Sequence, residues 1–243
     1  MESRGVKHLA YFQVDNPLVS LCDPTLIGHH LLAESEMTTQ VVRKRYPTEK
    51  VGNVVLVDDR LEIIEYSDLP ASAAEATDQD GDIRLWAGNI AVHVIDVSFL
   101  RRICGSESAL PFHRASKKVP FVDENGELVE PAEPNALKFE RFIFDLLPAA
   151  KNGFVVEALA SEAFAPVKNA DGAETDTPML AKQAIVALHR SWLEKAGFEV
   201  AKGVSVEINP RFSLYPEQLA EKMAAVDGFA EKSMIKDNQY FDV

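Results

Sequence analysis

The sequence predicts an α/β protein with a mixed sheet, followed by a small α+β element. Short apolar runs, many of them β-branched, alternate with segments of helical periodicity up to about residue 195. This alternation favours strands and helices packed in layers. The strand-like segments beyond that point, within residues 198–212, are predicted to belong to a separate region of the fold. We therefore expect one domain over residues 1–196 and a small C-terminal element over residues 197–243.

The predicted strands are short runs bounded by turn residues. Residues 51–69 place two apolar runs around a polar turn, which predicts a β-hairpin. Residues 83–103 predict a strand, a break at Gly88-Asn89, a second strand and a short helix. The other expected strands are residues 8–14, 38–46 and 153–159, together with two short strands around the Asn-Gly turn within residues 118–131.

Three helices are predicted from capping residues or from apolar spacing. Residues 23–34 begin with an acid and a proline and then carry aliphatic residues at helical spacing. A longer helix is expected over residues 177–197, where Thr177 is a natural cap. Residues 136–150 also show helical spacing. A last helix is expected near residues 215–225, and the final 15 residues are polar and expected to be loosely held.

Composition limits the possible partners. The chain has 243 residues, of which 47% are hydrophobic and 26% charged, and its net charge is −13. This acidic balance argues against non-specific binding to nucleic acid or to an anionic membrane surface. No 18-residue apolar run and no signal-peptide pattern is present. Cys22 and Cys104 have no metal-ligand spacing and are expected to be reduced thiols of a cytoplasmic protein, although a disulfide between them stays open.

Several polar residues stand at the ends of apolar segments. Asp15 ends the first predicted strand and precedes Asn16-Pro17, so its carboxylate lies at the mouth of a strand. It either closes a local turn through backbone N–H groups or contributes to a metal or phosphate site at the edge of the sheet. Taken singly, the other residues of this kind are best explained as solvated surface or turn residues; they are Glu65, Tyr66, Gly88, Asn89, Lys138 and Lys168.

Seven motifs in the same order resemble the later part of the UDP-sugar pyrophosphorylases, most of all the eukaryotic-type UDP-N-acetylglucosamine pyrophosphorylases. The resemblance covers residues from about 8 to 195 and is carried by "VDNPLV", "PTEKVGNVV", "IIEYSDL", "AGNIAVH", "HRASKKVPFVD", "NALKFERFIFD" and "FAPVKNADG". It implies a Rossmann-like nucleotidyltransferase sheet and the transfer of UMP from UTP to a sugar 1-phosphate, with Mg²⁺ as cofactor and pyrophosphate as the second product. Positioning and charge neutralisation are the main contributions to such a reaction.

The resemblance also implies roles for individual residues. Asp15 would bind the metal ion and the substrate, and Lys138 and Lys168 would act on phosphate oxygens as the catalytic lysines. The remaining residues would bind the sugar nucleotide; they are Gly52, Glu65, Tyr66, Asn89, Phe142 and Phe144. Phe142 is explained equally well as a core residue.

The phosphate-binding loop of the family, Gly-Gly-x-Gly-Thr-Arg, is not in the sequence, whose 12 glycines include no adjacent pair and no Gly-x-Gly. Backbone N–H groups of such a loop hold phosphates. We therefore expect an incomplete nucleotidyltransferase sheet, a missing N-terminal segment as a partner, and no turnover by this chain alone. The alternatives are a UTP–glucose-1-phosphate uridylyltransferase and a non-catalytic module that binds sugar phosphates or another chain.

The histidines give weaker signals. His93 is expected to be a hydrogen-bonded structural residue, and His29 and His30 are expected on the surface and flank of a helix. His113 precedes two lysines and either approaches the phosphates or lies in a solvated basic loop. No His/Cys metal site is apparent from residue spacing.

Overall fold

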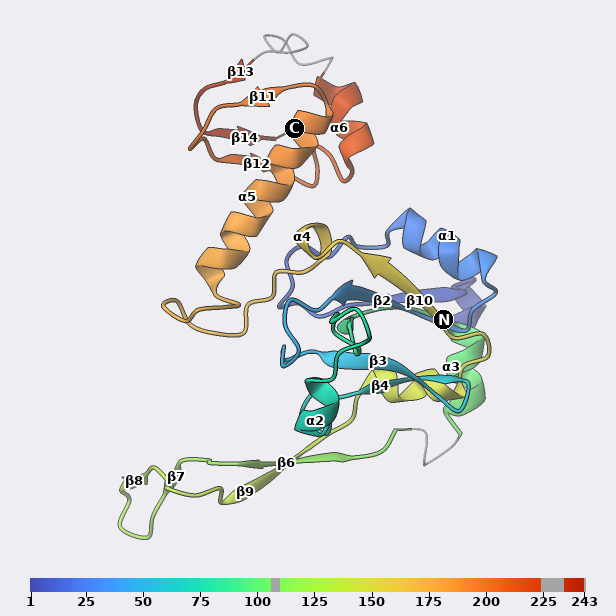
Figure 1. The fold of residues 1–243 in the computed structure, drawn as a ribbon, viewed down its shortest axis with the longest axis vertical. Coiled ribbons are helices and arrows are strands. Elements are labelled where there is room, and N and C mark those ends of the chain that lie inside the picture. Colours follow the sequence, from blue (N-terminus) through green and yellow to red (C-terminus); the bar gives the residue numbers. More distant parts are fainter. Residues whose placement is uncertain (106–109, 224–233, 243) are drawn as a thin grey trace.

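The computed structural model describes residues 1–105, 110–223 and 234–242, and a six-stranded mixed sheet lies at its centre (Figure 1). The strand order is β10-β2-β5-β3-β4, and β1 pairs with β5 as well. Within this sheet β10 and β2 run parallel, and the other described pairs are antiparallel. The strands are β1 (His8–Tyr11), β2 (Met37–Arg43), β3 (Gly52–Val57), β4 (Arg60–Ile64), β5 (Ala87–Asp96) and β10 (Phe154–Ala158). The expected mixed sheet is thus confirmed.

The long strand β5 organises the sheet, and nine of its ten residues are buried. Its first half pairs with β3 and its second half with β1, while β2 pairs with it along the other edge. The expected break at Gly88-Asn89 is wrong, because both residues pair within the strand. The irregularity falls later, where Ala91 has φ 55° and the register against β2 shifts, which is a β-bulge.

Apolar residues cover both faces of the sheet. One face packs against the helix α3 (Val97–Ile103) and the 3₁₀ helix η2 (Ile143–Ala149), around Phe99 and Leu147. The other face packs against α1 (Pro24–Leu32) and α4 (Ala160–Ala163). Successive residues of a strand point to opposite faces, so Val41 belongs to the first core and Val42 to the second. The remaining short elements of this part are η1 (Glu2–Arg4) and α2 (Ala71–Ala74).

A β-ribbon projects from the sheet (Figure 1). It consists of the antiparallel pairs β6 (His113–Lys117) with β9 (Ala136–Glu140) and β7 (Phe121–Val122) with β8 (Leu128–Val129). The predicted Asn-Gly turn lies between β7 and β8, with Gly126 at φ 84°. The helix expected over residues 136–150 is wrong in its first part, because pairing with β6 satisfies the backbone of β9 and the helical turns begin only at η2.

The C-terminal element has its own apolar core. It contains the end of the helix α5 (Pro178–Lys195) and the short elements β11 (Glu199–Val200), β12 (Val206–Ile208), α6 (Pro216–Met223), β13 (Met234–Ile235) and β14 (Gln239–Phe241). The Thr177 hydroxyl caps α5 as predicted. The expectation of a loose tail is wrong for residues 234–242, since Ile235 and Phe241 are buried in this core; the rest of that tail lies outside the described residues. The boundary between residues 196 and 197 stays a prediction.

Two further expectations about side chains have different outcomes. Cys22 and Cys104 are free and exposed, so the open alternative of a disulfide between them is wrong. His29 is exposed on α1 as expected, but His30 is buried, because its ring reaches Thr38 on β2 and Asp96 at the end of β5. Within the described part of the chain, no helix has the length and apolar character needed to cross a membrane.

His93 on β5 is fully buried, and its Nδ1 lies 3.1 Å from the hydroxyl of Thr39. Its Nε2 has no hydrogen-bond partner among the residues that the structure describes. Burial disfavours the charged imidazolium and lowers the pKa of His93 from 6.5 to about 3. Between pH 6.5 and about 3, the His93 imidazole therefore stays neutral in the native state, whereas in the unfolded chain it becomes protonated.

We expect the stability advantage of the wild type over His93→Asn to shrink in acid. Once the pH is below 6.5, and down to about 3, the unfolded state binds up to one more proton than the native state, so wild-type stability falls by up to about 1.4 kcal/mol per pH unit through this residue. Urea unfolding of both proteins at pH 7, 6, 5 and 4 measures the effect. Parallel stability curves over that range would contradict it.

Candidate functional site

Asn16 joins the chain that follows β1 to the segment that follows α4. Its Nδ2 donates to the carbonyl of Ala163 over 2.8 Å, and its Oδ1 accepts from the N–H of Ala165 over 3.0 Å. Next to it, the N–H of Val167 donates to the carbonyl of Asp15 over 2.8 Å. These bonds bring the segment of Lys168 beside the loop that follows β1, although about 150 residues separate the two segments in the sequence.

The side-chain carboxylate of Asp15 takes no part in these hydrogen bonds. The local turn that we considered for Asp15 is instead made by Asn16, whose Oδ1 accepts weakly from the N–H of Leu18 at 3.4 Å. Within residues 1–105, 110–223 and 234–242, no hydrogen bond or ion pair reaches the Asp15 side chain. A half-buried carboxylate without a partner is costly, which favours a ligand at this position.

A pocket of about 170 Å³ opens beside these residues. Its lining comes from the chain after β1, the start of β3, the end of β4, the bulge of β5, the chain before and within η2, and the chain after α4. The lining residues are Gln13, Asp15, Lys50, Val51, Gly52, Glu65, Tyr66, Asn89, Ile90, Ala91, Phe142, Phe144, Phe164 and Lys168. All predicted site residues except Lys138 therefore border one concave surface, while their roles stay predictions.

Strand register explains why three of these residues meet. Gly52 pairs with Asn89 across β3 and β5, and the next residue of β3 pairs with Ile64, so Glu65 lies beside Gly52. Asn89 Oδ1 accepts from the N–H of Ala91 over 3.0 Å, which fixes the side chain at the bulge. Its Nδ2 has no protein partner among the described residues. The amide N–H₂ of Asn89 is thus available to a ligand in the pocket.

Glu65 and Lys168 set the electrostatics of the pocket. Burial raises the pKa of the Glu65 carboxyl, and the charge of Lys168 acts against this rise. Lys168 itself is exposed, and its Nζ lies 3.5 Å from the carbonyl of Lys50 and 5.8 Å from the ring of Phe164. Among the described residues no carboxylate lies within ion-pair distance of Lys168, and such a lysine at the edge of a pocket suits an anionic ligand.

Aromatic rings form one wall of the pocket. The rings of Phe142 and Phe144 stack with their centroids 4.8 Å apart. The ring of His113 packs against that of Phe142, also with 4.8 Å between centroids, and its Nε2 lies 2.9 Å from Asp145. Although burial alone would lower the pKa of His113, the hydrogen bond and charge of Asp145, with Asp68, raise it. His113 is not part of the lining, so its contribution to the pocket is its contact with Phe142.

Lys138 lies elsewhere, on strand β9 of the projecting ribbon. Its Nζ forms an ion pair with Glu140 over 2.8 Å, and its side chain is 54% exposed. Pairing of β9 with β6 sets this position. The structure thus does not bring Lys138 to the pocket, and its predicted action on phosphate stays untested.

Sequence reasoning missed residues that complete or support the pocket. Lys50 stands two positions before Gly52 in the quoted "EKVGN" motif, so it could have been selected. No sequence pattern pointed to Lys44. It is buried, and its Nζ donates to the carbonyl of Pro47 over 2.8 Å and to Asn53 Oδ1 over 2.7 Å. Burial lowers the pKa of Lys44 in spite of the charge of Glu49. These bonds hold the loop that presents Lys50 and Gly52.

Comparison with known proteins shows the family of this chain. The sequence model of the family described as UTP–glucose-1-phosphate uridylyltransferase matches residues 1–230, so the chain belongs to this family. The chain is 42% identical over 198 residues to the human UDP-N-acetylhexosamine pyrophosphorylase-like protein 1, covering 81% of this chain and 39% of that protein. It is 38% identical over 225 residues to the UDP-N-acetylglucosamine pyrophosphorylase of Saccharomyces cerevisiae, covering 90% and 47%.

Solved structures agree with this assignment. A crystal structure of an Entamoeba histolytica protein assigned as a UDP-N-acetylglucosamine pyrophosphorylase matches with a TM-score of 0.84 and 30% identity, over 99% of this chain and 58% of that one. The resemblance to UDP-sugar pyrophosphorylases and the nucleotidyltransferase-like fold are therefore confirmed. The chain spans less than half of the length of the curated relatives named above.

We expect Gly52→Ala to destabilise the protein by about 1–3 kcal/mol, because the added methyl overpacks the wall of the pocket. A Cβ at Gly52 would lie 2.8 Å from Ile63 Cγ2 and 3.4 Å from Glu65 Oε2. Gly28→Ala is the matched control, since a Cβ there meets nothing within 4 Å and alanine favours the helix α1 by up to about 1 kcal/mol. Urea unfolding compares the two, and equal stability of both variants would show that Gly52 is not tightly packed.

Proposed function

We propose that the pocket binds the sugar and phosphate end of a UDP-sugar. In this proposal the chain supplies the sugar half of the site of a uridylyltransferase, which converts UTP and N-acetylglucosamine 1-phosphate into UDP-N-acetylglucosamine and pyrophosphate. The observation that carries the proposal is the pocket itself, in which an open carboxylate, a lysine, an amide and stacked rings meet. The relatives whose names include this sugar nucleotide support the choice of substrate.

The residues fit the Mg²⁺ ion that such a reaction implies. The Asp15 carboxylate has no protein partner among the described residues, and Mg²⁺ in nucleotide sites is held by one or two carboxylates together with phosphate oxygens and water. When bound, the ion neutralises phosphate charge. The assignment of Asp15 as its ligand is part of the proposal.

The chain's own residues would position the sugar phosphate. An oxygen of the sugar 1-phosphate attacks the α-phosphorus of UTP and pyrophosphate leaves, so the chain must hold the attacking group in line. Lys168 would contact its phosphate oxygens, and Glu65 would accept hydrogen bonds from sugar hydroxyls. The rings of Phe142 and Phe144 would exclude water from one side, and Tyr66 would cover the sugar.

The free Nδ2 of Asn89 favours an N-acetylated sugar, because it is a donor suited to the acetamido oxygen. UDP-glucose, which fits the description of the family, lacks this acceptor. The phosphate-binding Gly-Gly-x-Gly-Thr-Arg loop is absent from the sequence. We therefore propose that turnover needs a further segment that carries such a loop, and that this chain alone binds sugar phosphate without turning over UTP.

We expect Lys168→Ala to weaken binding of N-acetylglucosamine 1-phosphate about tenfold, since a hydrogen bond to a charged group contributes about 1.5–3 kcal/mol. The change removes an exposed side chain, so stability should stay within about 0.5 kcal/mol of the wild type. Isothermal titration calorimetry with the sugar phosphate and Mg²⁺ gives the affinity, and thermal unfolding gives the stability.

Lys182→Ala, which removes an exposed lysine of α5, is the matched control and should bind like the wild type. Unchanged affinity in Lys168→Ala would show that Lys168 is a solvated surface lysine that does not contact the ligand. Lys138→Ala in the same titration tests the ribbon lysine, and a tenfold loss there would mean that the ribbon approaches the bound phosphate.

A further inference from the structure

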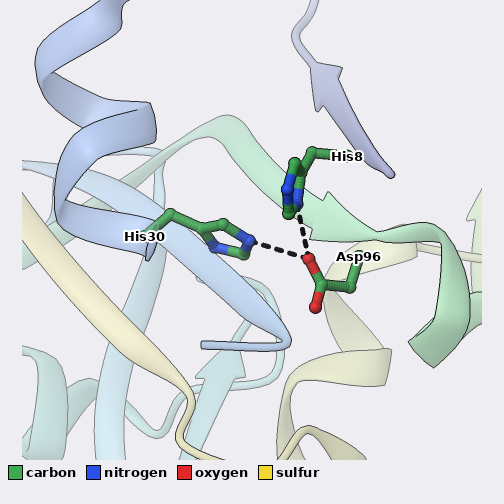
Figure 2. Close-up of side chains that lie close together, drawn as sticks. All are labelled: His8, His30 and Asp96. Carbon is green, nitrogen blue, oxygen red and sulfur yellow. Dashed lines mark hydrogen bonds and ion pairs between the residues drawn. The ribbon is translucent and has the colours of Figure 1, made fainter. Parts of the chain in front are cut away.

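Two histidines and an aspartate from three elements meet at the far end of β5 (Figure 2). His8 begins β1, His30 lies on α1, and Asp96 ends β5. Antiparallel pairing places His8 directly opposite Asp96. His30 reaches the same carboxylate from the covering helix. None of these residues borders the pocket of the proposed function.

The atoms of this cluster are arranged around one point. His8 Nδ1 lies 2.7 Å and His30 Nε2 lies 3.0 Å from the same oxygen, Asp96 Oδ1. All three atoms lie within 4.8 Å of one another. Ligand atoms of a four-coordinate Zn²⁺ at about 2.0–2.1 Å from the metal are separated by roughly 3.3 Å, so small side-chain adjustments would admit the ion.

The burial of the three side chains and the contact between His30 and Thr38 are compatible with a bound cation. The side chain of His30 is only 1% exposed, whereas those of His8 and Asp96 are 32% and 26% exposed, which leaves a path from solvent. His30 Nδ1 lies 2.8 Å from the hydroxyl of Thr38 on β2. With Nδ1–H donating to that hydroxyl, Nε2 keeps the lone pair that would bind the metal, and the hydroxyl orients the ring as second contacts of metal-binding histidines do.

We propose that His8, His30 and Asp96 bind a Zn²⁺-class ion, with water as the fourth ligand. Two imidazoles and one carboxylate suit Zn²⁺, Co²⁺ or Ni²⁺, whereas Mg²⁺ prefers oxygen ligands throughout. This ion is therefore different from the Mg²⁺ considered at Asp15. It would cross-link β1, α1 and β5.

Such an ion would lie away from the pocket of the proposed function. Asn89 in the pocket and Asp96 in the cluster are separated by seven positions of strand β5, at most roughly 23 Å at about 3.3 Å per residue and less by the bulge at Ala91. The ion would anchor the beginning of β1, whose other end leads to Asp15. In its absence the same side chains form the hydrogen bonds seen here, so the fold does not require it.

Zinc binding by the full chain tests the proposal. After dialysis against a chelator, calorimetry should show one Zn²⁺ bound per chain, and thermal unfolding should show a Tm raised by at least about 3 °C at saturating Zn²⁺. Co²⁺ should give the visible absorption of a four-coordinate site. Mg²⁺ at the same concentration should neither raise the Tm nor displace Co²⁺.

His8→Gln and Asp96→Asn should each weaken Zn²⁺ binding at least about tenfold and remove the Tm shift. His29→Gln is the matched control, since it removes the exposed histidine next to His30 and should bind as the wild type does. No Zn²⁺ uptake by the wild type would overturn the proposal, whatever the variants do. Uptake that survives both His8→Gln and Asp96→Asn, or that is lost in His29→Gln, would also overturn it.

Discussion

The hydrogen bonds of Asn16 are the constraint on which the site depends. One buried amide satisfies a carbonyl and an N–H of the segment after α4, and leaving such groups unpaired costs about 1–3 kcal/mol each. Because Asn16 precedes Pro17, its backbone is kept out of the helical region, within the turns that follow β1. The amide thus holds the chain that follows β1 beside the segment that carries Lys168 and leaves the Asp15 carboxylate at the pocket.

Strand pairing then supplies the rest of the site. Gly52 and Asn89 are direct partners in the sheet, and the bulge at Ala91 fixes how the Asn89 side chain lies. A bulge beside a binding site is a common way to redirect a side chain. The pocket therefore arises where irregular backbone meets a rigid central strand, and Glu65, with its raised pKa, lies at that junction.

Sequence alone predicted much of this arrangement. Turn and cap residues located the strands and the helices α1 and α5, and the ordered motifs selected eight of the residues that border the pocket. The spacing of apolar residues predicted the wrong secondary structure where strand pairing determines it. Phe139, the first of the apolar residues at helical intervals, belongs to a strand because β6 pairs with this part of the chain. Lys138 lies on the same ribbon and therefore away from the pocket. The meeting of His8, His30 and Asp96 left no signal, since it depends on the register of β1 against β5.

A crystal structure of the chain with UDP-N-acetylglucosamine and Mn²⁺ tests the central claim most directly. The account predicts an anomalous peak for Mn²⁺ beside the Asp15 carboxylate, a phosphate group within hydrogen-bond distance of Lys168 Nζ, and the acetamido group near Asn89 Nδ2. The bonds of Asn16 to Ala163 and Ala165 should be unchanged. A sugar nucleotide bound outside the pocket, or one bound within it with Asp15 and Lys168 turned away from its phosphates, would contradict the account.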